Sequence, residues 1–396
     1  MSDSGMVSLD LVRIGGDARF IVLHDGREVQ DAYFISKAPV RGFEKLMVGK
    51  NPVFAVEASM RICGICHSAH GIASVEAIED AVGIIPPPNG MILREIIGLL
   101  NRLQSHLVHM VFIVRDLFAE DVANDLLLVG IRLLRDVSDI LTRFGGAPTH
   151  PPNIVIGGVQ TIPKERYLSD SEKKLGGVLK EIQKIKNLFF DEEKWSDKAK
   201  ILSQAKTNFS YLASHIFYGD RYNIDTQQVS TMRYYEFRGN NIPAEAKRTT
   251  SLIALYRNNT VEVGPRARLA LFRSFGDGSI LGIQKARVLE MELIIDRVLE
   301  LISEINPSEP PRTTAMILRR GRGVAVYEAP RGTLIHYVTI DEEGRIGGYR
   351  IVVPTLFNIP IMEKACVGLP VEVADVIPRI YDPCIPCSTH LVRVDG

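Results

Sequence analysis

The chain has no net charge, no long apolar run and no basic segment at its start. Its 396 residues include 47 Lys and Arg against 47 Asp and Glu, so no overall field attracts nucleic acid or an anionic membrane surface. Residues 1–10 lack the basic start of a signal peptide, and no uninterrupted apolar run is long enough to span a bilayer. We therefore expect a cytoplasmic protein with no nucleic-acid partner and no transmembrane segment of its own, and export together with a partner stays open.

Internal repeats and low-complexity linkers are also missing. With 46% apolar and 24% charged residues, the chain has the composition of an ordinary globular protein and can bury a large core. We expect one domain over 1–396 of the α+β class, mostly α, in which a bundle of long helices carries small peripheral β-sheets. Its expected parts are a small N-terminal sheet at about 7–36, a helical body at about 41–305, and a C-terminal sheet with a cysteine loop at about 320–390.

Apolar residues at helical spacing predict the helices, and short β-rich runs predict the strands. The predicted helices are 41–50, ended by Pro52; one that opens near 67; two within 91–145, broken near 118–121; and 170–190, 196–206, 244–257 and 280–305. The predicted strands are three runs within 7–36 and the runs 323–329, 333–340 and 348–354. The last part of the chain, up to the second cysteine pair, shows little regular pattern.

Cysteine is scarce, and four of the five cysteines form two Cys-x-x-Cys pairs near opposite ends of the chain. The first pair is Cys63 and Cys66, followed by His70, and the second is Cys384 and Cys387, followed by His390. Thiolates are soft ligands for late transition metals, and a two-residue spacer lets two sulfurs reach one ion. A metal shared by both pairs would bring the two ends of the fold together.

Other interpretations of these residues are weaker. A structural zinc site usually keeps its cysteine pairs within roughly 12–20 residues of each other, far closer than here. Disulfides are disfavoured because nothing marks the chain as secreted. Cys366 has no partner nearby in sequence and is expected to be a small buried hydrophobe. His106 and His109 share a helix face as metal ligands sometimes do, but we expect them to be buried in the core or near a partner.

Both cysteine motifs resemble those of the large subunit of nickel–iron hydrogenases. Arg-x-Cys-Gly-x-Cys-x-x-x-His occupies 61–70, and Asp-Pro-Cys-x-x-Cys-x-x-His occupies 382–390. Further family-like stretches are RGFE (41–44), SHLVH (105–109), HPPNIVIGG (150–158), YGDR (218–221), EVGPRARL (262–269), EAPRG (328–332) and VPTLFN (353–358). The resemblance covers essentially the whole chain and is greatest to the cytoplasmic archaeal hydrogenases that reduce a deazaflavin or a viologen. It implies the hydrogenase large-subunit fold.

The resemblance also implies an activity, the reversible heterolytic cleavage of molecular hydrogen to protons and electrons. By position, Cys63 and Cys384 would bind nickel alone, and Cys66 and Cys387 would bridge nickel to an iron that carries cyanide and carbonyl ligands. Hydrogen is a very weak acid, so its cleavage needs a Lewis-acidic metal and a base within bond distance. The terminal thiolate of Cys384 can be that base.

Three further residues would act at the open side of the metals. Arg331 of the EAPRG stretch would place its guanidinium over the open coordination site, and Asp382 would pair with it and fix its orientation. Asp116 would be a second carboxylate of this canopy. Without the cysteine motifs, Arg331 would be interpreted as a buried arginine satisfied by backbone carbonyls.

Five residues would complete the surroundings of the metals in the family arrangement. Pro330 and Thr355 would border the diatomic ligands, with Thr355 as a hydrogen-bond donor, and His70 would hydrogen-bond a bridging sulfur. Glu44 and His390 would hold a magnesium or iron ion near the C-terminus. Glu44 has a simpler alternative, a carboxylate in the first turn of a helix.

One position departs from the family. The family usually has Arg-x-Glu-Gly-His near the N-terminus, and its glutamate takes the proton from the terminal cysteine. Here the aligned residues are 13–17, with Gly15 at the glutamate position. If this segment is a strand, Asp17 would point to the same side as residue 15 and would be the nearest alternative base in sequence. A route through Asp382 and Asp116 is the competing prediction.

Cys366 alone cannot hold an iron–sulfur cluster, so electrons must pass to another protein. The resemblance implies an iron–sulfur small subunit and a further subunit linked to a deazaflavin, to NAD(P) or to heterodisulfide reductase. It also implies a maturation protease that cuts after His390 and removes 391–396. The alternatives are a hydrogen-sensing subunit with the same centre and a non-catalytic electron-transfer scaffold, and the four cysteines argue against the scaffold.

Overall fold

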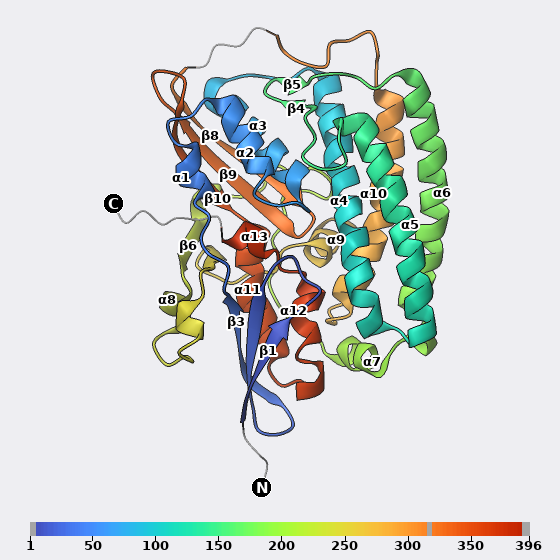
Figure 1. Cartoon of the computed structure of the whole chain (residues 1–396), viewed down its shortest axis with the longest axis vertical. Helices are drawn as coiled ribbons and strands as arrows, with labels where there is room; N and C mark the ends of the chain where they lie inside the picture. The colour runs from blue at the N-terminus through green and yellow to red at the C-terminus, as the bar shows by residue number, and fades with distance from the viewer. Residues whose placement is uncertain (1–4, 315–318, 390–396) are drawn as a thin grey trace.

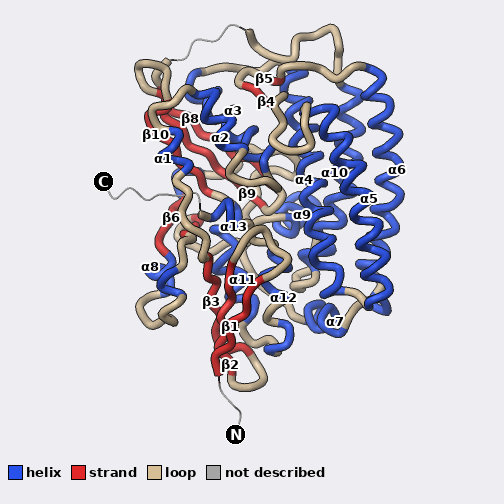
Figure 2. The backbone as a smooth tube through the Cα atoms, viewed as in Figure 1, coloured by secondary structure: helices blue, strands red, loops and turns tan. Residues whose placement is uncertain are grey.

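The computed structural model describes residues 5–314 and 319–389, which form two halves. Long helices stand side by side in one half, and two three-stranded sheets with shorter helices make up the other (Figure 1, Figure 2). One continuous cluster of buried apolar side chains spans both halves. The single domain over 1–396 stays a prediction.

The helical half contains α4 (Pro88–Leu117), α5 (Glu120–Gly145), α6 (Glu165–Phe190) and α10 (Gly282–Glu304). Helix α4 packs against α5 and α10, and α6 packs against the same two helices. The four helices confirm the predicted ones, including the break after α4, where Phe118 has an extended backbone.

Among the described helices, α4 is long and apolar enough to cross a bilayer. However, 83% of its most apolar window is buried inside the protein, as expected for the central helix of a bundle.

Both larger sheets are antiparallel, with sequence-adjacent strands as neighbours. The N-terminal sheet consists of β1 (Gly5–Leu11), β2 (Ala18–His24) and β3 (Val29–Ser36), and the C-terminal sheet of β8 (Gly321–Ala329), β9 (Gly332–Ile340) and β10 (Ile346–Val352). These bounds confirm the predicted strands. The predicted helix near 67 is α3 (His67–Val82), which packs on β8 and β9 so closely that a Cβ on Gly323 would overlap the backbone of Ala77.

The segment before the first cysteine pair differs from its prediction. Helix α1 is limited to Phe43–Met47, and a second helix, α2, occupies Pro52–Met60. Pro52 therefore begins a helix, because a proline at the first helical position has the right φ and needs no N–H donor there. Asn51 caps this helix by accepting a hydrogen bond from the Val53 N–H at 2.8 Å.

The helix predicted at 244–257 is wrong. Residues Ala246–Arg248 form a single 3₁₀ turn, and Leu252–Tyr256 is strand β7, paired antiparallel with β6 (Val229–Arg233). Pairing with a strand far away in sequence overrides the local apolar pattern. A smaller hairpin of β4 (Ile154–Val155) and β5 (Gly158–Val159) interrupts the helices as the Pro- and Gly-rich stretch suggests.

The remaining helices are short, and the sequence pattern anticipates α7 (Asp197–Gln204) but not the others. These are α8 (Tyr234–Arg238), α9 (Pro265–Arg273), α11 (Pro354–Cys366), α12 (Val376–Tyr381) and α13 (Ile385–Ser388). Nearly every residue of α11 is buried, so its sequence shows no amphipathic period. This helix packs against β3, α12 and α13, and so connects the N-terminal sheet to the second cysteine loop.

Candidate metal centre

The four motif cysteines meet in the interior of the protein. Their sulfur atoms all lie within 4.8 Å of one another, and all four are buried free thiols. The Sγ atoms of Cys63 and Cys384 are 3.3 Å apart, those of Cys66 and Cys387 are 3.2 Å apart, and those of Cys384 and Cys387 are 3.0 Å apart. The two ends of the sequence therefore converge on one point, as the motifs predict.

The first pair lies in the turn between α2 and α3, and Cys66 immediately precedes α3. The backbone N–H groups of Ile65 and Cys66 both point at the Cys63 sulfur, at 3.3 and 3.4 Å. The Asn101 side chain of α4 donates to the Ile65 carbonyl at 2.9 Å and ties this turn to the helical half. Such N–H groups stabilise a sulfur that carries negative charge.

The second pair is held by two segments that are distant in sequence. The Cys384 N–H donates to Thr355 Oγ1 of α11 at 3.0 Å. The Ile385 N–H donates to the Gly15 carbonyl at 2.7 Å, and Gly15 and Cys384 form a single parallel bridge. The N-terminal segment thus lies directly against the second loop.

This cluster of sulfurs calls for a cation. Hydrogen bonds from the other three sulfurs, that of Cys384 first, lower the pKa of Cys63 well below its usual value. The Cys384 sulfur and burial raise the pKa of Cys66. The pKa of Cys387 is also raised, and burial is the largest cause. Four buried thiolates cannot exist side by side without a compensating positive charge. A soft divalent metal such as nickel suits a set of four sulfur donors.

Arg331 and Asp382 lie together beside the cysteines. The Arg331 guanidinium donates to the Asp382 backbone carbonyl at 2.6 Å and to its carboxylate at 2.9 Å. Arg331 also lines a small buried cavity together with Cys66, Cys384 and Cys387. The structure therefore brings Arg331 to the sulfurs and fixes it through Asp382.

Asp382 is ionised despite its burial. Burial alone would raise its pKa, but Arg331 and His109, with a smaller effect from Arg287, hold that pKa well below its usual value. The Arg287 guanidinium lies 3.5 Å from Oδ2, and His109 Nδ1 lies 3.5 Å from Oδ1. Its backbone has a φ of 55°, a left-handed conformation that is strained for aspartate and that turns the chain into the cysteine loop.

Thr355 and Pro330, the two residues predicted to border the diatomic ligands, lie close to this cavity. Thr355 lines it directly, and its hydroxyl oxygen already accepts a hydrogen bond from Cys384. Pro330 lies between two lining residues, Ala329 and Arg331, and its carbonyl accepts a hydrogen bond from Arg268 at 3.3 Å.

His70 faces the second cysteine pair from α3. Its Nε2 lies 3.5 Å from the Cys387 sulfur, and its Nδ1 lies 3.2 Å from Nε2 of His336. Burial lowers the pKa of His70 to about 4, so the imidazole is uncharged. His336 is not among the residues predicted from the sequence, although a polar residue in the middle of the apolar run 333–340 is a signal that could have identified it.

Only one of the two residues predicted for a second metal lies in the described part of the chain. Glu44 of α1 is buried, and its carboxylate accepts a hydrogen bond from the Ile351 N–H at 2.6 Å. His390 lies outside the described residues.

Asp116 lies at the end of α4 and contacts two arginines rather than Arg331 or the cysteines. Its carboxylate accepts from Arg13 at 2.8 Å and from Arg379 at 3.0 and 3.2 Å. Arg13 precedes Gly15 by two residues, and Arg379 lies in α12, just before the second cysteine loop. These contacts make Asp116 a clamp between the two segments that meet at the loop.

A proton route through Asp17 requires that residues 13–17 form a strand, and this condition is not met. Residues 13–17 do not form a strand between β1 and β2, and the Asp17 side chain is exposed. Gly15, in contrast, lies against Cys384, and a Cβ there would lie 3.6 Å from the Cys384 Cα in ordinary van der Waals contact.

Comparisons with known proteins agree with this geometry. The pattern that defines the nickel-dependent hydrogenase family matches residues 41–114 and 275–390. The chain is 38% identical over 381 residues to the coenzyme F420 hydrogenase subunit alpha of Methanocaldococcus jannaschii, which covers 93% of this chain and 89% of that protein. Identity to the subunit of the same name from Methanothermobacter thermautotrophicus is 33% over 376 residues, covering 94% of this chain and 90% of that protein.

Solved structures show the same fold. The Ni-Fe-Se hydrogenase of D. vulgaris Hildenborough matches with a TM-score of 0.85 at 22% identity, covering 98% of this chain and 100% of that chain. Because the fold, the four convergent cysteines and the relatives all agree, the chain belongs to the nickel-dependent hydrogenase family, in which it is the large, catalytic subunit of an enzyme that acts on molecular hydrogen.

Proposed function

We propose that this subunit passes electrons from hydrogen to a deazaflavin, coenzyme F420, through an iron–sulfur partner. The observation that supports the proposal is the sequence identity of this chain to its relatives. Three proteins named coenzyme F420 hydrogenase subunit alpha share 38%, 33% and 28% identity with this chain, and each covers 93% or 94% of it. Two proteins named F420-non-reducing hydrogenase share 25% and 26%.

The experiment is to purify the chain with the subunits that accompany it and to supply hydrogen with one acceptor at a time. We expect hydrogen-dependent reduction of F420, which is measured as the loss of its visible absorbance. Reduction of NAD(P) or of a disulfide carrier without reduction of F420 would refute this acceptor. Steady turnover also separates the enzyme from the hydrogen-sensing and scaffold alternatives, because neither of these sustains hydrogen-dependent reduction of an acceptor.

For the centre itself, we propose nickel held by all four cysteines, with Cys66 and Cys387 shared with an iron that carries cyanide and carbonyl ligands. When bound, the metals supply the Lewis-acidic site that polarises hydrogen for heterolytic cleavage. The Sγ atom of Cys384 would hold the released proton, and Arg331, which lines the same cavity, would provide a fixed positive charge. Burial of the cavity keeps bulk water away from this step.

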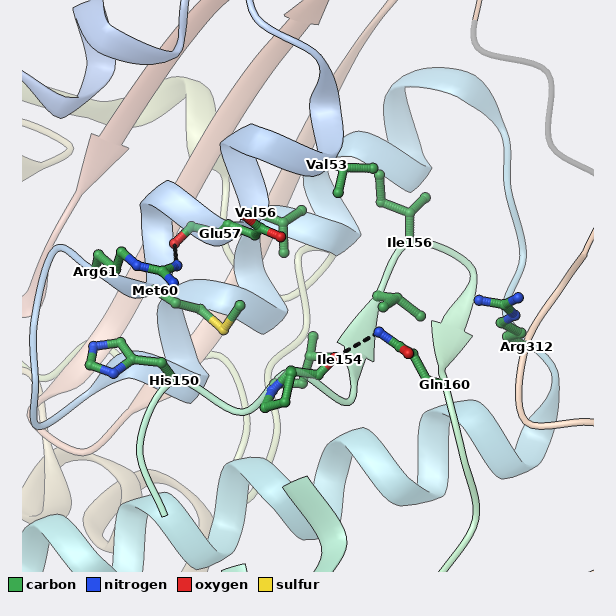
Figure 3. A pocket seen from close by; sticks show the side chains of 12 residues that line it. Val53, Val56, Glu57, Met60, Arg61, His150, Ile154, Ile156, Gln160 and Arg312 are labelled. Carbon is green, nitrogen blue, oxygen red and sulfur yellow. Dashed lines mark hydrogen bonds between the residues drawn. The ribbon is translucent and has the colours of Figure 1, made fainter. Parts of the chain in front are cut away.

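A face beside the first cysteine pair is the proposed docking surface for the iron–sulfur partner. A largely apolar cavity of about 480 Å³ opens there between α2 and the 150–160 segment, and Arg61 and His150 lie at one end (Figure 3). The His150 ring lies 5.3 Å from that of the buried His67, and Arg61 is two residues from Cys63. This face therefore offers a short path from the sulfurs to an electron acceptor outside the chain.

A charged substitution tests this docking surface. Val53 of α2 lines the cavity and is largely exposed, and Leu128 of α5 is a still more exposed apolar residue on the helical half. We expect Val53→Asp to reduce the amount of iron–sulfur subunit that co-purifies and Leu128→Asp to leave it unchanged. Equal amounts with both variants would place the partner elsewhere.

The other expectations from the resemblance stand as proposals. A magnesium or iron ion at Glu44 and His390, a protease that removes 391–396 and a cytoplasmic location all fit the family pattern. The additional subunit would carry the flavin chemistry that the proposed acceptor requires.

A further inference from the structure

A line of hydrogen-bonding side chains leads away from the candidate metal centre on the side of Cys387. It begins with His70 Nε2, 3.5 Å from the Cys387 sulfur, and continues from His70 Nδ1 to His336 Nε2 at 3.2 Å. His336 Nδ1 lies 2.8 Å from the Tyr349 hydroxyl, which lies 2.8 Å from the Ser74 hydroxyl. The four side chains come from α3, β9 and β10, and all are buried.

The direction of this line follows from the charge of its first atom. A metal-bound cysteine is a thiolate, which accepts hydrogen bonds and has no proton to donate. An uncharged imidazole has one N–H and one lone pair, so His70 can donate to the Cys387 sulfur only through Nε2–H. Its Nδ1 must then accept, and the group opposite it, His336 Nε2, must carry the proton.

The same rule applies one step further along. With its proton on Nε2, His336 has a lone pair on Nδ1 that needs a donor. The Tyr349 O–H, at 2.8 Å, is that donor. Tyr349 has one hydroxyl proton, and either hydroxyl of the Tyr349–Ser74 contact can donate, so when Tyr349 donates to His336 the Ser74 O–H donates to the Tyr349 oxygen at 2.8 Å. Each proton position in the line is thus determined by its neighbour, and the series ends at two hydroxyls.

We propose that Tyr349 is a positioning residue of the metal centre: its hydroxyl selects the tautomer of His336, which selects the tautomer of His70 and so directs an N–H at the Cys387 sulfur. The inference rests on the metal-ligand role proposed for Cys387. A hydrogen bond to a ligating thiolate withdraws electron density from the metals, so Tyr349 tunes them through three hydrogen bonds without touching them.

Tyr349→Phe is the appropriate change, because it removes one oxygen and keeps the ring that packs edge-on against His336 at 5.6 Å. Its control is Tyr337→Phe. Tyr337 lies on the neighbouring strand β9, and its hydroxyl donates to the Thr226 carbonyl at 2.8 Å. Both variants lose one tyrosine hydroxyl from the same sheet, but only one of them belongs to the line.

Two readouts besides activity apply to the purified complex. The first is the infrared carbonyl band of the iron, which should move to lower frequency in Tyr349→Phe because the sulfur regains electron density. The second is nickel retained per chain after dialysis against a chelator, which should fall in Tyr349→Phe. Tyr337→Phe should match the wild type in both. A wild type without a carbonyl band would refute the proposed iron ligands, and nickel retention would then decide the role of Tyr349 by itself.

A double variant separates positioning from a loss of packing. A glutamine at position 336 can offer an amide N–H to His70 whether or not Tyr349 is present. We therefore expect His336→Gln combined with Tyr349→Phe to recover the nickel retention and the band position that Tyr349→Phe alone loses. If Tyr349→Phe behaves like Tyr337→Phe, or if the double variant is no better than Tyr349→Phe, the proposal is wrong.

Discussion

Replacing Asp116 by asparagine distinguishes a structural clamp from a proton carrier. The carboxylate binds Arg13 and Arg379, which belong to the two segments that meet where Gly15 contacts Cys384. Asparagine has nearly the same shape but no charge, and it keeps only one oxygen to accept hydrogen bonds. If Asp116 is a clamp, the variant should destabilise the fold and the metal loop. If it carries protons, the variant should slow turnover and leave the fold intact.

The size of the structural effect follows from burial. Removing one partner of a buried ion pair costs about 3–5 kcal/mol. Asp116 is 8% exposed and Arg379 is 4% exposed, but Arg379 keeps a second carboxylate partner, Asp375, at 2.6 Å. Arg13 is partly exposed and can turn to solvent. The cost should therefore lie near the lower limit, at about 3 kcal/mol.

This loss of stability can be converted to a change in melting temperature. Unfolding entropy of about 2.1 cal/mol/K per residue gives about 0.8 kcal/mol/K for 396 residues. A loss of about 3 kcal/mol then lowers the melting temperature by about 4 °C.

The assay is thermal unfolding together with nickel per chain and turnover per bound nickel. Asp375→Asn is the matched control, because Asp375 binds the same Arg379 but is 33% exposed, where an ion pair contributes about 0–1 kcal/mol. We expect Asp116→Asn to melt lower and to hold less nickel, with turnover per nickel unchanged. A normal melting temperature and nickel content combined with a large loss of turnover per nickel would refute the clamp and support the proton route through Asp382 and Asp116.

Four further predictions concern the centre, the C-terminal cleavage and the stability of the fold. Gly15→Glu should keep nickel and leave turnover equal or higher, whereas Gly16→Ala should lose nickel, because Gly16 has a φ of 114° and a Cβ there would lie 2.7 Å from a neighbouring side chain. Cys63→Ser should abolish nickel binding in elemental analysis, and finding only zinc in the wild type would contradict the assigned metal. Intact mass of active, nickel-loaded protein should correspond to a chain ending at His390, and an active species that keeps 391–396 would refute this. Burial raises the pKa of Glu363 from 4.5 to about 7, so the native state binds the extra proton and stability falls as pH rises between these values; Glu363→Gln should flatten this fall in melting temperature.

Local patterns predict those parts of the fold in which local forces decide. The long helices have an apolar stripe of their own, and the strands of both larger sheets pair with sequence neighbours across short turns. Two of the failures have tertiary causes. Residues 252–256 form a strand because β6 pairs with them from a distance, and helix α11 is buried all round and so lacks a polar face.

The site residues also divide into those that the sequence predicts and those that depend on tertiary packing. The four cysteines, Arg331 and Asp382 belong to compact motifs, and the structure brings them together. Residues that act through other residues have no motif. His336 and Tyr349 form their hydrogen-bonded line only because β9, β10 and α3 pack against one another.

Gly15 links the sequence and the structure most directly. The resemblance to the family motif alone indicates that a side chain is missing there, and the structure shows that the missing side chain would start 3.6 Å from the Cys384 Cα, with ordinary contacts around it. The position is therefore open to a larger residue, since its φ lies outside the left-handed region where only glycine is comfortable. Asp17 does not compensate for the glycine, because it is exposed and no strand aligns it with residue 15. On the proposal that Cys384 holds the proton, that proton would leave through other groups at the centre, either the Arg331–Asp382 pair or water in the space beside Gly15. Gly15→Glu tests whether this proton step limits turnover: a gain in turnover means that it does, and an equal rate means that it does not.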